Sequence, residues 1–134
     1  MPISVLIVED EFLIRSLVAD CLSESGFAVL EAESGDEALD YLQSGAEVDV
    51  LFTDIDLPGS IDGAKLAERA RQIYPELPVV YASAGARADD IRPLLPRARF
   101  MPKPYDPAQV CTLLASLAEG NGANGAHARA AIGH

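Results

Sequence analysis

Short apolar runs alternate with amphipathic segments along this chain. Five runs are of strand type, namely residues 3–8, 27–32, 50–54, 77–83 and 99–101. The first four contain Val, Ile or Leu, and the short last one holds Phe100 and Met101. Between them, apolar side chains recur at helical spacing over residues 12–25, 34–44, 62–74 and 106–119. Strands that alternate with helices form parallel sheets with right-handed crossovers. The pattern therefore predicts an α/β domain with helices on both faces of a parallel sheet.

Several predicted helices begin with a recognisable capping signal. Ser34 precedes Glu37 by three residues, which is the spacing of a capping box. Asp62 opens the third long helix, and Asp106 is followed by Pro107 at the first helical position. These side chains accept hydrogen bonds from the first free backbone N–H groups of a helix, so we expect the helices to begin at these residues.

Two stretches depart from the regular alternation. Pro93 and Pro96 interrupt the segment 86–97, where we expect a short or irregular helix of about two turns at most. Beyond residue 119 the chain is rich in Gly and Asn and has no periodicity, which predicts a flexible C-terminal tail over residues 120–134. The length of 134 residues otherwise fits one domain, which we place at residues 1–119.

The chain is acidic, with 21 Asp and Glu against 10 Lys and Arg and a net charge of −11. Because no cluster of Lys and Arg is present, we expect no direct binding of nucleic acid. No apolar run approaches the length of a membrane span, and the first residues do not resemble a signal peptide. We therefore expect a soluble, cytoplasmic protein without membrane insertion.

The two cysteines, Cys21 and Cys111, lie in separate helical patterns, and neither has a histidine at metal-binding spacing. We expect both to be small buried hydrophobic side chains. A disulfide or another redox role is the less favoured alternative.

Reactive side chains follow directly on the apolar runs: Glu9 and Asp10, Asp54, Ser83 and Lys103. If these runs are parallel strands, the groups meet at the carboxyl edge of the sheet, where open α/β sheets bind ligands. Clustered carboxylates repel one another and raise each other's pKa unless a cation neutralises them. The pattern therefore predicts a cation-binding pocket at this edge.

The chemistry of these groups suits phosphoryl transfer. Asp10 and Asp54 are hard oxygen ligands for Mg²⁺, and Glu9 can complete the shell through water. An aspartate can also act as a nucleophile that forms an acyl phosphate, for which we select Asp54. Lys103 can pair with a phosphoryl oxygen, and Ser83 can donate its hydroxyl to another.

Taken together, these motifs resemble the receiver domains of two-component response regulators. The matching stretches are Val5 to Glu11, Leu51 to Pro58, Asp62-Gly63, Pro78 to Ala84 and Phe100 to Pro104, and the resemblance covers roughly residues 3–118. It implies a flavodoxin-like (βα)5 fold with five parallel strands in the order 2-1-3-4-5. It also implies that Asp54 is the phosphoacceptor, that Glu9 and Asp10 hold Mg²⁺ with Asp54, and that the backbone carbonyl of Asp56 is a further ligand.

The same resemblance implies a conformational switch. Ser83 stands where the family has a hydroxyl that moves toward the phosphoryl group, and Lys103 where it has a salt-bridging lysine. Phe100 matches the aromatic switch residue, with plain strand packing as the alternative. Phosphorylation is then expected to shift the population toward a form with an altered partner-binding surface.

We therefore expect a single-domain response regulator that receives its phosphoryl group from a histidine kinase or a histidine phosphotransfer protein. It would not be an enzyme beyond its own phosphorylation and dephosphorylation. Two alternatives stay open. The first is a phosphorylation-independent adaptor with the same fold. The second, less favoured, is a small phosphatase that uses Asp54 as nucleophile and Asp56 as general acid.

Overall fold

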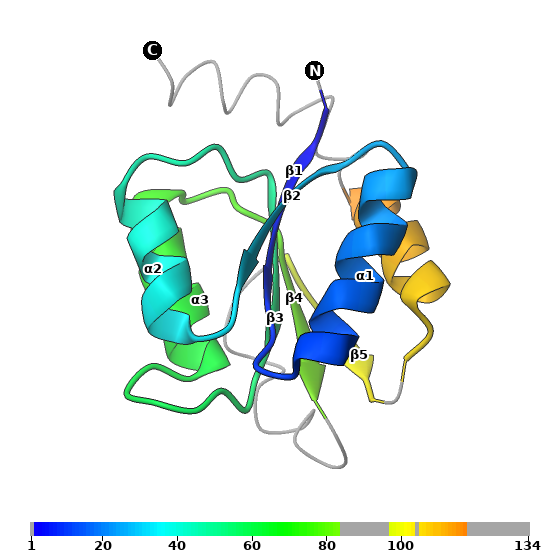
Figure 1. Ribbon diagram of the computed structural model, residues 1–134. Coiled ribbons are helices and arrows are strands. Elements are labelled where there is room, and N and C mark those ends of the chain that lie inside the picture. The colour runs from blue at the N-terminus through cyan, green and yellow to red at the C-terminus, as the bar shows by residue number, and fades with distance from the viewer. Residues whose placement is uncertain (1, 84–96, 104, 118–134) are drawn as a thin grey trace.

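The computed structural model describes residues 2–83, 97–103 and 105–117 (Figure 1). The strands are β1 (Ser4–Val8), β2 (Ala28–Ala32), β3 (Val50–Asp54), β4 (Val79–Ser83) and β5 (Ala98–Pro102). The helices are α1 (Phe12–Glu24), α2 (Gly35–Gln43), α3 (Gly63–Ile73) and a last one at residues 107–117, called helix 107–117. Within the described residues, every predicted strand and long helix is confirmed, with ends shifted by one or two residues.

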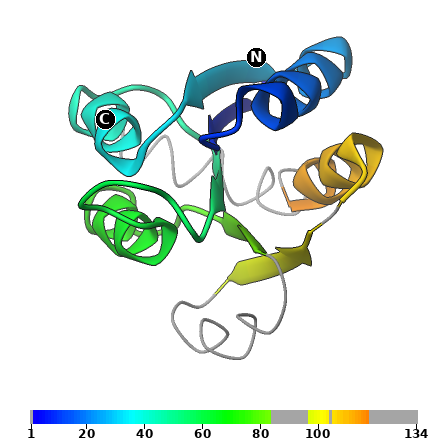
Figure 2. The same ribbon diagram turned by 60° about the horizontal axis from the view of Figure 1, so that its bottom comes forward.

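The strands form one parallel five-stranded sheet in the order β2-β1-β3-β4-β5. This is the order that the sequence resemblance implied. Helices α2 and α3 cover one face, and α1 and helix 107–117 cover the other, as the two views in Figures 1 and 2 agree. The predicted three-layer α/β arrangement is thereby confirmed.

The core is divided by the sheet into two apolar layers. Alternate residues of β1 point to opposite faces, so that Leu6 packs in the layer beneath α2 and α3, while Ile7 packs in the layer beneath α1. Every residue of β3 and β4 is buried. Strands covered on both faces need apolar side chains in both directions, which explains why these strands appear in the sequence as apolar runs that turn polar only at their carboxyl ends.

The predicted capping side chains are in place at α2 and α3. Ser34 Oγ accepts a hydrogen bond from the Glu37 N–H at 3.1 Å, and Asp62 Oδ1 accepts one from the Lys65 N–H at 2.8 Å. The Glu37 carboxylate accepts from the N–H of Glu33 at 2.8 Å, one residue before the cap. The bonds at Ser34 and Asp62 satisfy backbone donors that the helices leave free, and so set where α2 and α3 begin.

Helix 107–117 also begins where predicted, since Asp106 Oδ1 accepts a hydrogen bond from the Ala108 N–H at 2.9 Å. The expected short helix within 86–97, apart from residue 97, and the expected tail at 120–134 lie outside the described residues, as does the proposed domain boundary at 119. In the part of the chain that is described, no helix combines the length and apolar content needed to cross a membrane.

Candidate functional site

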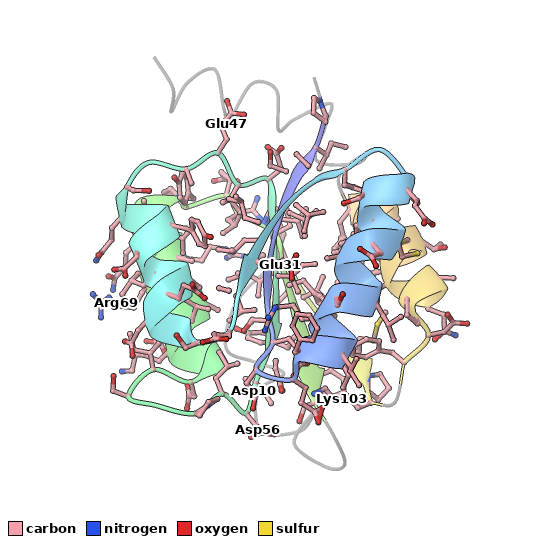
Figure 3. The ribbon with its side chains drawn as sticks, viewed as in Figure 1. Asp10, Glu31, Glu47, Asp56, Arg69 and Lys103 are labelled. Atoms are coloured by element: carbon pink, nitrogen blue, oxygen red, sulfur yellow. The ribbon has the colours of Figure 1, made fainter. Side chains whose placement is uncertain are left out.

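The parallel register brings the predicted site residues to one edge of the sheet. Asp54 lies opposite Ala82, and Ser83 lies opposite Pro102, so the carboxyl ends of β3, β4 and β5 are level. Figure 3 shows Asp10, Asp56 and Lys103 at this same end, with Glu47 at the other. The end of β1 is level with them too, because Val8 pairs with Thr53.

Lys103 connects two buried carboxylates. Its Nζ lies 3.0 Å from Asp54 Oδ2 and 3.2 Å from Glu9 Oε1. The side chains of Glu9 and Asp54 are 3% and 6% exposed, and that of Lys103 is 20% exposed. Burial alone would lower the pKa of Lys103, but its contacts with Asp54 and Glu9 outweigh burial and raise it. Lys103 is therefore a permanent cation inside the site.

Each of the two buried carboxylates is held at both oxygens. Asp54 Oδ1 accepts a hydrogen bond from the Asp56 N–H at 3.1 Å, and Glu9 Oε2 accepts one from the Glu11 N–H at 3.1 Å. The other oxygen of each faces Lys103. Backbone N–H groups that follow the strands thus fix one oxygen of each acid, and the Lys103 ammonium fixes the other.

The carboxylates of Glu9, Asp10 and Asp54 suit a divalent cation. One oxygen from each lies within 4.8 Å of the other two, and Asp10 is exposed at the mouth of the site. Burial raises the pKa of Glu9, with the charge of Asp54 adding to the shift, while Glu11 and Lys103 only partly offset it. Lys103 leaves two of the three negative charges uncompensated. The donor set, hard oxygens with one open side, is the kind that Mg²⁺ takes.

Ser83 and Phe100 lie where the sequence placed them, and their switching roles stay predictions. Ser83 is fully buried at the end of β4, and its carbonyl accepts a hydrogen bond from the Lys103 N–H at 2.8 Å. Phe100 is half-buried, pairs with Tyr81 across β4 and β5, and packs against the layer beneath α2 and α3. Asp56 is exposed beside the site, and the role of its carbonyl as a metal ligand also stays a prediction.

Sequence reasoning missed two side chains around the acids. Arg15 Nη1 donates to the Glu9 carbonyl at 2.8 Å, while Arg15 Nε pairs with Glu31 at 3.1 Å. Tyr105 packs its ring edge-on against Phe52, with the ring centroids 5.7 Å apart. Burial raises the pKa of Tyr105, and the charge of Glu9 adds to the shift. The sequence signal for Arg15 is its position near the start of a helix that directly follows an acidic loop, where a cation can contact that loop.

Gly63 is a third contributor that the sequence analysis treated only as part of a motif. A Cβ at this position would overlap the Asp54 carbonyl oxygen and lie 2.7 Å from Ile55 Cα. The Gly63 N–H also donates to the Ile55 carbonyl at 3.0 Å. The start of α3 therefore packs directly on the backbone that carries Asp54, and only glycine permits this approach.

Comparisons with known proteins agree with this geometry. The model of the response regulator receiver domain matches residues 5–115. Sensor kinase CckA of Brucella abortus (strain 2308) is 34% identical over 119 residues, which make up 87% of this chain and 12% of the kinase. The DNA-binding transcriptional regulator NtrC of Klebsiella pneumoniae is 35% identical over 102 residues, or 75% of this chain and 21% of the regulator.

Solved structures extend the likeness to the fold. The crystal structure of a response regulator receiver protein from Sinorhizobium medicae WSM419 superposes with a TM-score of 0.80 at 32% identity, covering 87% of this chain and 94% of that one. The receiver domain of the hybrid histidine kinase CckA superposes with a TM-score of 0.73 at 33% identity, covering 85% of this chain and 97% of that one.

The likeness to CckA and NtrC is confined to a small part of each protein, since the chain spans 12% and 21% of their lengths. The family match, in contrast, covers most of this chain and includes Glu9, Asp54, Ser83 and Lys103. The chain therefore belongs to the response regulator receiver domain family of two-component signal transduction.

Proposed function

We propose that Asp54 accepts a phosphoryl group from a histidine kinase or a histidine phosphotransfer protein, and that Glu9, Asp10 and Asp54 hold the Mg²⁺ that this reaction needs. The observation that supports it most strongly is the Lys103 ammonium lying between Asp54 and Glu9. It places a fixed cation next to a buried carboxylate, which is what an anionic phosphoryl group requires.

In the proposed reaction a carboxylate oxygen of Asp54 attacks phosphorus. The P–N bond of a phosphohistidine breaks, and its electron pair stays on the imidazole nitrogen. The N–H of Asp56 keeps the carboxylate oriented through Oδ1. Lys103, which pairs with Oδ2 in the present state, transfers its contact to a phosphoryl oxygen. Mg²⁺ held by Glu9, Asp10 and Asp54 would supply charge neutralisation for the phosphoryl group.

The phosphoryl group is proposed to act as a switch. It adds negative charge and acceptor oxygens at the end of β3. Ser83, buried at the end of β4, provides a hydroxyl for one of these oxygens, and Phe100 changes its packing on the β5 side. The output would be altered binding to a downstream protein.

The donor protein is proposed to dock on the first half of α1, beside the site. Phe12, Leu13 and Leu17 are 65%, 74% and 59% exposed, and they are the large hydrophobic side chains that stand out at the surface of the described residues. They begin two residues after Asp10. An apolar patch next to a reactive group is suited to partner binding.

The chain itself is proposed not to turn over separate substrates. A phosphatase that uses Asp54 and Asp56 would need the second acid near the leaving group, whereas the Asp56 backbone N–H already holds Asp54 and its side chain is exposed. An adaptor that binds its partner without phosphorylation would have no functional need for Lys103 between the buried Asp54 and Glu9.

Incubation with acetyl phosphate and Mg²⁺, followed by intact mass measurement and phosphate assay, tests the proposal. We expect the mass to increase by one phosphoryl group when Mg²⁺ is present. We expect no increase without Mg²⁺ or in Asp54→Asn. Steady phosphate release from a small phosphoester would favour the phosphatase. Absence of an adduct, with partner binding indifferent to Mg²⁺ and to Asp54→Asn, would favour the adaptor.

A further inference from the structure

A second pair of reactive side chains lies away from the carboxylate site. The Sγ atoms of Cys21 and Cys111 are 2.9 Å apart, and both cysteines carry free thiols. This separation lies between an S–S bond of about 2.05 Å and ordinary non-bonded contact, which is about 3.5–4.0 Å between carbon atoms. The sequence pattern predicts two separate, buried hydrophobic side chains, and the structure places them in contact.

The fold brings the two sulfurs together across two helices. Cys21 lies in α1 and Cys111 in helix 107–117, which run side by side on the same face of the sheet (Figures 1 and 2). Both pack in the apolar layer formed with Val18, Leu22 and Leu114. Well-packed neighbours on each helix keep the thiols facing each other, so that bond formation would need only a small movement.

A route from solvent reaches the pair. Cys21 is half-buried. Cys111 is buried but lines a cavity of about 390 Å³ together with Ile3, Phe27 and Thr112. Ile3 and Phe27 precede β1 and β2, so this cavity lies at the end of the sheet opposite to Asp54. An oxidant can therefore reach the half-buried Cys21 from solvent, and neither Cys21 nor the cavity beside Cys111 is part of the phosphoryl site.

We propose that Cys21 and Cys111 form a reversible redox pair, which a small-molecule disulfide such as oxidised glutathione converts to an intramolecular disulfide joining α1 to helix 107–117. The Cys21 thiolate attacks one sulfur of the oxidant, forms a mixed disulfide and releases one thiol. Cys111 then loses its proton and attacks the Cys21 sulfur, expelling the second thiol. Two protein thiols are oxidised and one disulfide is reduced to two thiols, so atoms and electrons balance.

The two cysteines are suited to different roles in this sequence. Burial, aided by the hydrogen bond to Cys21, raises the pKa of the Cys111 thiol to about 11. Cys111 therefore stays protonated at neutral pH and is a poor first nucleophile. Cys21 is the more exposed sulfur and receives the oxidant, after which Cys111, already in contact, closes the bond.

The disulfide would join residues 90 positions apart in the sequence. Closing so long a loop restricts the unfolded chain strongly, and we expect the melting temperature to rise by about 5–15 °C. The carboxylate site shares no residue with the pair, so phosphorylation at Asp54 is not needed for the disulfide to form.

Incubation of the full chain with oxidised glutathione, followed by intact mass measurement without reductant, tests the pair. Wild-type protein is expected to lose two hydrogen atoms, carry no glutathione, remain monomeric, melt at a higher temperature and revert with dithiothreitol. Cys111→Ala should retain one glutathione on Cys21 with no rise in melting temperature. Cys21→Ala should stay unmodified, because the buried Cys111 does not react first.

Three results of the mass measurement would overturn the proposal. They are glutathione retained on wild-type protein, a disulfide-linked dimer, and two thiols that persist in the native state under conditions that modify Cys111→Ala. A melting temperature that falls on oxidation would equally contradict it, because the bond would then require a distorted fold.

Discussion

The Lys103 Nζ lies 3.0 Å from Asp54 Oδ2 although the two residues are 49 positions apart in the sequence. The contact joins the end of β3 to the loop after β5, across the intervening strand β4. It is also shared, since Glu9 Oε1 lies 3.2 Å from the same nitrogen. One ammonium, from the end of β5, thus holds together two acids from the ends of β1 and β3, and its removal should affect both stability and chemistry.

Replacement of Lys103 by Met should destabilise the Mg²⁺-free protein by about 2–3 kcal/mol, because two buried carboxylates lose their cation while the apolar stem is kept. Urea unfolding measures this loss. Added Mg²⁺ should recover more stability in the variant than in the wild type. Lys65→Met, at an exposed lysine of α3, is the matched control and should change little. Equal losses in both variants would contradict a special role for Lys103.

Replacement of Asp10 by Asn should weaken Mg²⁺ binding at least about tenfold, since it removes one of three charged oxygen ligands. The apo protein should be as stable as wild type or slightly more so, because repulsion among the carboxylates falls. Melting curves at increasing Mg²⁺ concentrations measure both effects. The exposed Asp20 on α1 serves as control, and an Asp20→Asn variant that loses as much Mg²⁺ response would argue against the assigned site.

Replacement of Gly63 by Ala should cost at least about 3 kcal/mol of stability and reduce phosphorylation, because the new methyl group collides with the backbone at Asp54. Gly26→Ala is an instructive control. Gly26 has φ of 95° with nothing within 4 Å of an added Cβ, so alanine there should cost about 1–2 kcal/mol from strain alone and leave phosphorylation intact. Similar behaviour of the two variants in urea unfolding and acetyl phosphate assays would refute the close-packing explanation.

Tyr81 is 2% exposed, and its hydroxyl has no hydrogen-bond partner among the described residues. Tyr81→Phe should therefore stabilise the protein by about 1 kcal/mol at pH 8. Burial also raises the pKa of Tyr81 to about 12 from 10.0. Between pH 10 and pH 12 the unfolded state loses the Tyr81 proton before the folded state does, so the stability of the wild type falls as pH rises. The stability advantage of Tyr81→Phe over the wild type should therefore be larger at pH 11 than at pH 8 by about 1.4 kcal/mol.

Urea unfolding of both proteins at pH 8 and pH 11 measures this difference. Tyr74 and Tyr105, whose pKa values burial also raises, are common to both and cancel in the comparison. A variant less stable than wild type at pH 8, or an advantage that shrinks with pH, would show that the Tyr81 hydroxyl is satisfied in the folded state.

The exposed apolar side chains of α1 should matter to a protein donor and not to a small one. A double variant, Leu13→Ser with Leu17→Ser, should slow phosphoryl transfer from a phosphorylated histidine protein at least about tenfold, because an apolar contact is lost. Acetyl phosphate should label the variant at the wild-type rate, since both residues are largely exposed and lie outside the acid cluster. Equal slowing with both donors would indicate damage to the site itself.

The apolar runs and capping residues sufficed to predict the strands and the long helices, because central strands and helix starts carry strong local signals. The carboxyl-edge cluster of Glu9, Asp54 and Lys103 could also be predicted, since parallel strands bring their ends together by topology. What the sequence does not encode locally is contact across helices. Cys21 and Cys111 lie in independent patterns, and only the packing of α1 on helix 107–117 brings them into contact.

The same limit explains the other omissions. The apolar periodicity of α1 does not distinguish Leu17, which is exposed, from Val18, which is buried, because both belong to one broad apolar stripe. The carbonyl contact of Arg15 with Glu9 depends on the direction in which α1 leaves the sheet. Gly63 was visible in the sequence, but the reason for it lies in a backbone approach that only coordinates reveal.

The central claim, that Asp54 is the phosphoacceptor, is tested most directly by locating the phosphoryl group. Protein treated with acetyl phosphate and Mg²⁺ is reduced with borohydride, which converts an aspartyl phosphate to homoserine, and is then sequenced by tandem mass spectrometry. We predict homoserine at position 54 and nowhere else, and none when Mg²⁺ is chelated. Homoserine at Asp10 or Asp56, or an unmodified chain at full Mg²⁺, would contradict the account.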